Sequence, residues 1–332
     1  MNTSSPSPSG SSWRGGQGER PEPASENRKF LIARLSALGD TVCSLPAAVA
    51  LKRGFPDCHI TWAVDPRFAG IVECCGAVDE VVRVKSPWTR LPGRFDVALD
   101  LQGLLKSGLV VGLAKAKEKV GYHWQREGSG LFSRRVSPDP TSFHVVDQYV
   151  DVARAVGGVM DHAEFALTPK HDDVLNVRRK LKERGVVGRF ALMNAGAGWV
   201  TKRWPPSHFA ALIDRLHDEL EIPTVLLGGP SDGPIAQEVI DLCKTKPASL
   251  VGETGVRELV ALIRLASVHV GGDTGSTHLA AALDIPAVGL YGLTRPQRSC
   301  PYGQIDRCHH DERGLAFIEV EPVWEKVRAA LQ

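Results

Sequence analysis

The sequence predicts an α/β protein with two doubly wound parallel sheets that face each other across a cleft. Short runs rich in Val, Leu, Ile and Ala alternate with helical patterns along the 332-residue chain, as in βαβ units whose helices cover both faces of a sheet. The alternation runs over about residues 30–158 and starts again near residue 189, which indicates two units of similar length. Ligands of such sheets bind beyond the carboxyl ends of the strands.

The first unit shows four strand patterns and four helical patterns. Nearly continuous apolar runs predict strands over residues 30–35, 58–64, 78–84 and 95–103. Helical patterns follow over residues 41–53, 67–75, 104–117 and 144–158. Pro56 ends the first of these helices, because proline cannot continue one.

The second unit repeats this organisation. Strands, some with their following turns, are expected over residues 189–199, 222–232, 268–275 and 286–292. Helices are expected over residues 205–220, 233–243, 255–267 and 320–332, with a further one beginning near residue 274. Pro205 and Pro206 stand at the start of the first helix, a position that proline favours.

Composition narrows the class of protein. The formal net charge of +2 gives no global field for nucleic acid, so no nucleic-acid partner is expected. Residues 1–28 are rich in Ser, Pro and Gly and predict a disordered tail. No signal-peptide core and no apolar run of about 18 residues occurs, so we expect a cytoplasmic protein.

The cysteines predict no disulfide framework and no metal site. Seven cysteines, an odd number, are scattered among apolar stretches of a long chain, which favours reduced thiols. The group formed by Cys300, Cys308, His309 and His310 matches no common zinc spacing. We therefore expect no bound metal.

Three polar groups follow predicted strands, and each has two interpretations. Asp40 follows a glycine turn at a helix start, where a carboxylate either caps the helix or faces a ligand. The loop "NAGAGWVTKRWP" carries Thr201, Lys202 and Arg203 as donors and is either an anion-binding loop or an ordinary polar loop. The third group is the stretch "VGGDTGSTHLAAALDIPAVGLYG".

This third group places polar side chains where a helix begins. Asp273, Thr274, Gly275, Ser276 and His278 lie at or next to the first helical turn, whose free N–H groups favour a phosphate. The alternative is a capping box without a ligand. Two glycines before the aspartate favour the close approach of another group.

These stretches together resemble a family. The blocks "LIARLSALGDTVCSLPAAVALKRGFP", "DLQGLLKSGLVVGLAKAKEKVGYHWQREGSGLFSRR" and the stretch at residues 270–292 are similar to lipopolysaccharide heptosyltransferases of glycosyltransferase family 9. The resemblance covers about residues 29–332. It implies a GT-B fold of two Rossmann-like domains: an acceptor-binding domain over residues 29–165 and a nucleotide-sugar-binding domain over residues 166–318. A C-terminal helix over residues 319–332 would pack back on the first domain.

The same resemblance implies a reaction and its residues. The reaction is an inverting, metal-independent transfer of heptose from ADP-heptose, without a cofactor, to the Kdo sugar of lipid A in lipopolysaccharide core biosynthesis. Asp40 would be the general base, and Lys202 and Asp273 would act at the diphosphate and the donor sugar. The donor site would comprise Thr201, Lys202, Asp232, Thr254, Asp273, Thr274, Gly275 and His278.

The second block resembles the branch of the family that adds the first heptose. Its acceptor is strongly anionic, so the resemblance implies binding through cations and a histidine, namely Lys106, Arg126, Arg134, Arg135 and His144. The run at residues 115–126 is equally consistent with a solvated surface. The loop that begins Asn194-Ala195 departs from the proline-containing loop common in relatives.

Other functions stay open at this stage. A transferase or epimerase that uses another nucleotide sugar would share the donor pocket, and a non-catalytic binding protein would share the fold. A dehydrogenase is less consistent, because neither half carries Gly-x-Gly-x-x-Gly after its first strand. We also expect peripheral contact with the inner face of the membrane through Trp88 and Trp124.

Overall fold

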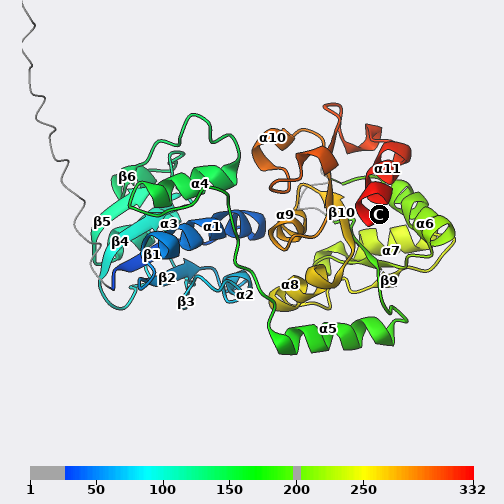
Figure 1. Cartoon of the computed structure of the whole chain (residues 1–332), viewed down its shortest axis with the longest axis horizontal. Helices are drawn as coiled ribbons and strands as arrows, with labels where there is room; N and C mark the ends of the chain where they lie inside the picture. Colours follow the sequence, from blue (N-terminus) through cyan, green and yellow to red (C-terminus); the bar gives the residue numbers. More distant parts are fainter. Residues whose placement is uncertain (1–26, 197–202) are drawn as a thin grey trace, which may run out of the picture.

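Two parallel sheets form the framework of the molecule. The computed structural model describes residues 27–196 and 203–332. In this part, one six-stranded sheet has the order β3-β2-β1-β4-β5-β6 and the other has the order β12-β11-β10-β7-β8-β9. The strand pairs within both sheets are parallel. Figure 1 shows the two domains side by side, the first in blue to green and the second in green to red. The predicted fold class is confirmed.

The first domain alternates strands and helices. Its strands are β1 (Lys29–Ala33), β2 (His59–Val64), β3 (Glu80–Arg83), β4 (Phe95–Asp100), β5 (Ala116–Gly121) and β6 (Arg134–Arg135). Its helices are α1 (Leu38–Gly54), α2 (Ala69–Val72), α3 (Leu105–Leu113) and α4 (Val145–Arg154). Four of the five β1 residues and five of the six β2 residues are buried, because helices cover both faces of the sheet.

The second domain is built in the same way. Its strands are β7 (Ala191–Asn194), β8 (Thr224–Leu226), β9 (Ala248–Ser249), β10 (Val268–Gly272), β11 (Ala287–Tyr291) and β12 (His309–His310). Its helices are α5 (His171–Glu183), α6 (Pro206–Leu220), α7 (Gly233–Leu242), α8 (Val256–Leu265), α9 (Gly275–Ala282), α10 (Pro296–Ser299) and α11 (Val320–Leu331). Every residue of β7, β10 and β11 is buried.

Several local elements differ from the sequence expectation, among them the short strands β6, β9 and β12 and helix α10, for which no element was expected. Residues 116–121 form strand β5 rather than the end of a helix; only its last two residues are buried, and its charged side chains hid the strand signal. Helix α5 occupies a segment for which no element was expected. Helix α1 begins at Leu38 rather than residue 41, so Asp40 lies in its first turn.

The C-terminal helix packs on the second domain, not on the first as expected. Helix α11 contacts α6, β10 and β11, and Figure 1 shows it beside α6. Val323, Trp324 and Val327 are fully or almost fully buried in the same core cluster as Trp204 and Leu216. This apolar stripe is covered by its own sheet, which is why the helix stays with the second domain.

Candidate active site

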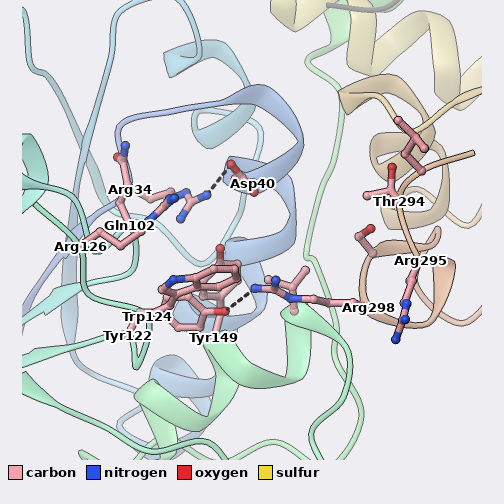
Figure 2. Close-up of a pocket in the computed structure, with 13 residues that line it drawn as sticks. Arg34, Asp40, Gln102, Tyr122, Trp124, Arg126, Tyr149, Thr294, Arg295 and Arg298 are labelled. Carbon is pink, nitrogen blue, oxygen red and sulfur yellow. Dashed lines mark hydrogen bonds and ion pairs between the residues drawn. The ribbon is translucent and has the colours of Figure 1, made fainter. Parts of the chain in front are cut away.

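A cavity of about 470 Å³ lies between the two domains. The first domain contributes Arg34, Asp40, Gln102, Tyr122, Trp124, Arg126, Val145 and Tyr149, and the second contributes Leu293, Thr294, Arg295, Arg298 and Ser299. Most of these residues follow the carboxyl ends of β1, β4, β5 and β11, as expected for parallel sheets. In Figure 2, Arg298 of the second domain extends to the aromatic side chains of the first domain, whereas Arg295 points away from them.

Asp40 is the carboxylate of this cavity. Its Oδ2 lies 2.6 Å from a guanidinium nitrogen of Arg34, and half of the Asp40 side chain is exposed, against 5% of Arg34. The same oxygen accepts the backbone N–H of Ala37 at 3.3 Å, so the carboxylate also caps the helix that carries it. Asp40 therefore serves both predicted roles: it caps α1 and faces the cavity.

An aromatic and cationic wall closes the cavity. The guanidinium carbon of Arg298 lies 4.4 Å from the ring centroid of Trp124, and that of Arg126 lies 5.4 Å from it. Arg298 also donates to the hydroxyl of Tyr122 at 3.3 Å, and this hydroxyl in turn donates to Gln148. The contacts of Arg298 cross from the second domain to the first (Figure 2).

The charge of the cavity favours an anionic ligand. Four arginines line it, namely Arg34, Arg126, Arg295 and Arg298, together with the single carboxylate of Asp40. Arginine presents several fixed N–H donors that match carboxylate and phosphate groups. An acidic sugar or a phosphorylated one would fit this donor set, with Trp124 offering a face for a sugar ring.

The second polar group lies at the start of α9. Asp273 Oδ1 is 3.5 Å from His278 Nε2, and the two side chains are 13% and 10% exposed. Burial alone would lower the pKa of His278, but Cys43 and Asp273 outweigh it and raise that pKa well above its ordinary value. Asp273 and protonated His278 thus form an ion pair beside the helix N-terminus.

A network of hydroxyls and amides holds this helix start. Asn194 at the end of β7 donates to Ser276 Oγ at 2.9 Å and to Thr274 Oγ1 at 3.4 Å, and its Oδ1 accepts the N–H of Gly196. Ser276 also contacts His269 Nε2 at 3.1 Å, and burial lowers the pKa of His269 to about 3, so the ring is neutral. The strand ends thereby fix the orientation of the α9 N-terminus.

Two glycines bring this helix start next to that of α1. A Cβ added to Gly275 would lie 2.3 Å from a Leu38 side-chain carbon, and one added to Gly39 would lie 2.9 Å from His278. The helices α1 and α9 therefore meet through glycine backbone, and Figure 1 shows them adjacent between the domains. Gly275, predicted as a donor-binding residue, is also a contact between domains.

The other predicted donor residues lie at neighbouring strand ends or outside the described part. The Oδ2 atom of Asp232 accepts the N–H of Gly229 at 2.8 Å, and the carboxylate lies against Gly196. Thr254 precedes α8 and is partly buried. Thr201 and Lys202 lie outside the described residues, as does the tail over residues 1–26.

The predicted acceptor residues separate into two groups. Arg126 lines the cavity, and Lys106 lies nearby, donating to Ser36 Oγ at 2.7 Å. Arg134 and Arg135 are exposed on β6 and are not among the residues lining the cavity, and Arg134 is paired with Glu118 at 2.8 Å.

The assignment of His144 to the acceptor is wrong. Its Nδ1 accepts the N–H of Val146 at 3.2 Å, and its Nε2 lies 2.9 Å from the carbonyl oxygen of Cys300. The ring is 8% exposed, so it caps α4 and joins it to the second domain. No ring nitrogen is left for a carboxylate or phosphate of the acceptor.

Several cavity residues were missed from the sequence. Tyr122 follows β5, whose charged side chains weaken the strand signal, and Thr294, Arg295 and Arg298 follow β11. Both groups lie beyond the carboxyl end of a parallel strand, where ligands of such sheets bind. Trp124, expected at a membrane surface, is a wall of the cavity, whereas Trp88 is 67% exposed and is not among its lining residues.

Comparisons with known proteins show which family this chain is similar to. A family model described as glycosyltransferase family 9 (heptosyltransferase) matches residues 85–316. The lipopolysaccharide core heptosyltransferase OpsX of Haemophilus influenzae is 25% identical over 84% of this chain and 83% of its own length. Lipopolysaccharide heptosyltransferase 1 of Escherichia coli K12 is 25% identical over 90% of this chain and 99% of its own.

Solved structures share the fold. A glycosyltransferase of family 9 from Veillonella parvula has a TM-score of 0.82 at 20% identity and covers 92% of this chain and 98% of its own. The E. coli heptosyltransferase WaaC with ADP has a TM-score of 0.74 at 23% identity and covers 91% and 99%. The fold and the cleft therefore define a two-domain glycosyltransferase of the GT-B type. The chain belongs to glycosyltransferase family 9, the heptosyltransferases, as the resemblance predicted.

Proposed function

We propose that this enzyme transfers a heptose from ADP-heptose to the Kdo sugar of lipid A, with inversion and without a metal ion, in lipopolysaccharide core synthesis. One observation carries the proposal within the family. The half-exposed carboxylate of Asp40 lies in an arginine-rich cavity between the domains, and its helix meets the α9 N-terminus. A base for the acceptor and a site for an anionic leaving group are thus adjacent.

The donor is proposed to lie at the carboxyl edge of the second sheet. The N-terminus of α9 offers free N–H groups and a positive dipole end to the diphosphate. Asp273, Thr274, Gly275 and His278 would contact the diphosphate and heptose, Lys202 and Thr201 would add donors, and Asp232 and Thr254 would flank the nucleoside. E. coli WaaC, which shares the fold, has been solved with ADP and with ADP-2-deoxy-2-fluoro heptose.

The chemistry follows from the placement of charge. As the acceptor oxygen bonds to the anomeric carbon, its proton moves to the carboxylate of Asp40, and the bond from that carbon to the diphosphate oxygen breaks. The electron pair leaves with ADP. General-base help of this kind contributes about 10²- to 10⁴-fold in rate. Protonated His278 and the α9 dipole would stabilise the negative charge that develops on the leaving diphosphate.

The acceptor is proposed to bind in the arginine-rich cavity. Arg126 belongs to the first domain, and Arg295 and Arg298 belong to the second, so the acceptor would touch both domains. The carboxylate of a Kdo sugar matches these donors. Arg134 and Arg135, on the outer strand β6, would contact only a group that extends beyond the cavity.

The place of action follows from the acceptor. Within the described residues, no helix is long and apolar enough to cross a bilayer. We propose that the enzyme works in the cytoplasm and meets its lipid-linked acceptor at the inner face of the membrane. Trp88, which is 67% exposed and is not among the residues lining the cavity, is the proposed contact with such a surface.

The test is ADP release on mixing the purified protein, ADP-heptose and Kdo-bearing lipid A. Release that requires the acceptor, persists in EDTA and disappears in a folded Asp40→Asn variant would support the proposal. The proposal also requires an inverted anomeric configuration in the product, which NMR can determine. Tight binding of ADP-heptose without release would refute the acceptor, and neither binding nor release would refute the donor.

A further inference from the structure

Arg34 is a buried cation directly beside the proposed base. It follows β1, and its side chain is 5% exposed. One guanidinium nitrogen donates to the carbonyl oxygen of Leu101 at 2.6 Å, another lies 2.6 Å from Asp40 Oδ2, and the guanidinium carbon lies 5.2 Å from the ring centroid of Tyr149. These contacts fix the guanidinium from three sides. A charge this deeply buried requires an ionised partner.

Asp40 rather than Asp100 supplies the countercharge. Asp100 is fully buried near Arg34, but its Oδ1 accepts the N–H groups of Gln102 and Gly103, and its Oδ2 has no hydrogen-bond partner. Burial raises the pKa of Asp100 and favours its neutral form. The pKa of Arg34 is raised, because Tyr149 and Asp40 outweigh the effect of its burial.

The pair also decides which oxygen of Asp40 faces the cavity. Arg34 and the N–H of Ala37 both use Oδ2, and within the described part of the chain Oδ1 makes no hydrogen bond. Half of the side chain is exposed to the cavity. In Figure 2 the ion pair runs between the guanidinium and the carboxylate at the edge of the lined space.

We propose that Arg34 is a positioning residue for Asp40: it holds Oδ2 in place and directs Oδ1 toward the acceptor hydroxyl. This inference rests on the proposed role of Asp40 as the base. In the reaction, the hydroxyl proton moves to Oδ1 while Oδ2 keeps its contact with Arg34, and Arg34 itself neither gains nor loses a proton. Without Arg34 the carboxylate would rotate freely.

The experiment measures kcat and the acceptor KM separately for the full-length enzyme, with ADP-heptose and Kdo-bearing lipid A. Arg34→Gln should lower kcat by about ten- to a hundredfold with little change in the acceptor KM, because a misplaced catalytic group costs up to about a hundredfold in rate. Arg34→Lys should recover part of the lost kcat. Arg126→Gln removes a charge from the same cavity and should instead raise the acceptor KM, with a smaller effect on kcat.

Folding and the base assignment are checked separately. ADP binding and thermal unfolding show whether each variant folds, and if Arg34→Gln does not fold, Arg34→Lys must still lower kcat without raising the acceptor KM. Adding Arg34→Gln to Asp40→Asn should cost no further activity, because Arg34 acts through that carboxylate. An Arg34→Gln variant with a raised acceptor KM and an unchanged kcat would overturn the proposal for Arg34. Wild-type activity in Asp40→Asn would instead overturn the base assignment on which it rests.

Discussion

The two helices that meet between the domains begin alike and use their carboxylates differently. Asp40 lies in the first turn of α1, is half exposed, and pairs with an arginine from a neighbouring strand end. Asp273 lies just before α9, is 13% exposed, and pairs with His278 of that same helix. One carboxylate keeps an oxygen toward the cavity, whereas the other is enclosed beside an imidazolium. In the proposed mechanism, these environments suit Asp40 to proton transfer and Asp273 to leaving-group binding.

Asparagine at each position gives the largest expected contrast. Asp40→Asn should lower kcat by about 10²- to 10⁴-fold, because the acceptor proton has no base, while the affinity for ADP-heptose stays near wild type. Asp273→Asn should weaken ADP-heptose binding and lower the unfolding temperature, since His278 loses its partner. Steady-state kinetics, calorimetric titration and thermal melts separate the two. Equal effects of both changes on kcat and on donor affinity would contradict the division of roles.

The glycine contact between the helices predicts the next largest effect. Gly275→Ala places a Cβ 2.3 Å from Leu38, so the two domains must shift, and we expect a loss of about 1–3 kcal/mol in unfolding free energy. Gly233→Ala, at the start of α7, is the matched control, because its Cβ would meet nothing within 4 Å. Urea denaturation measures both. A Gly275→Ala variant as stable as the control would show that the contact is not tight.

The sequence predicted those site residues that follow strands with a clear apolar pattern. Asp40 and Asp273 follow β1 and β10, both almost wholly buried runs, so the rule for parallel sheets located them. Tyr122 and Trp124 escaped, because β5 carries Lys and Glu side chains and its apolar pattern is weak. The pair between Arg34 and Asp40 could not be predicted, since it depends on where the turn places two side chains six residues apart.

His144 shows why residue type alone misleads. A histidine among cations suggested an anionic ligand, but its two nitrogens are used by backbone groups of Val146 and Cys300. Only the tertiary contact with the second domain decides this. The C-terminal helix teaches the same lesson, because its apolar stripe does not say which of two domains will cover it.

The ion pair of His278 and Asp273 predicts a dependence of stability on pH. The folded state raises the pKa of His278 well above its ordinary value of 6.5, so the pair contributes fully below about pH 6.5 and is lost as the pH rises through the folded-state pKa. His278→Gln should cost about 1.5–3 kcal/mol at pH 6, the range for an interaction with a charged group, and less at alkaline pH. Unfolding temperatures of both proteins across this range test it, and a constant difference would contradict the raised pKa.

The smallest expected effect compares an arginine of the cavity with an arginine on the outer strand of the first domain. Arg298→Gln removes the contacts with Trp124 and Tyr122 and should raise the acceptor KM by about tenfold, near the 1.5 kcal/mol of a hydrogen bond to a charged group. Arg134→Gln should change it by less than about twofold, because Arg134 is exposed and paired with Glu118.

Kinetics at fixed ADP-heptose and varied acceptor compare these two variants. Arg328→Gln, an exposed arginine paired with Glu325 on α11, is the matched control for loss of surface charge. If Arg134→Gln raised the KM as much as Arg298→Gln while this control did not, the acceptor would extend along β6 and the predicted contrast would be wrong. If Arg134→Gln raised the KM and Arg298→Gln did not, the first domain would recognise the acceptor, and the proposed contribution of Arg298 from the second domain would be refuted.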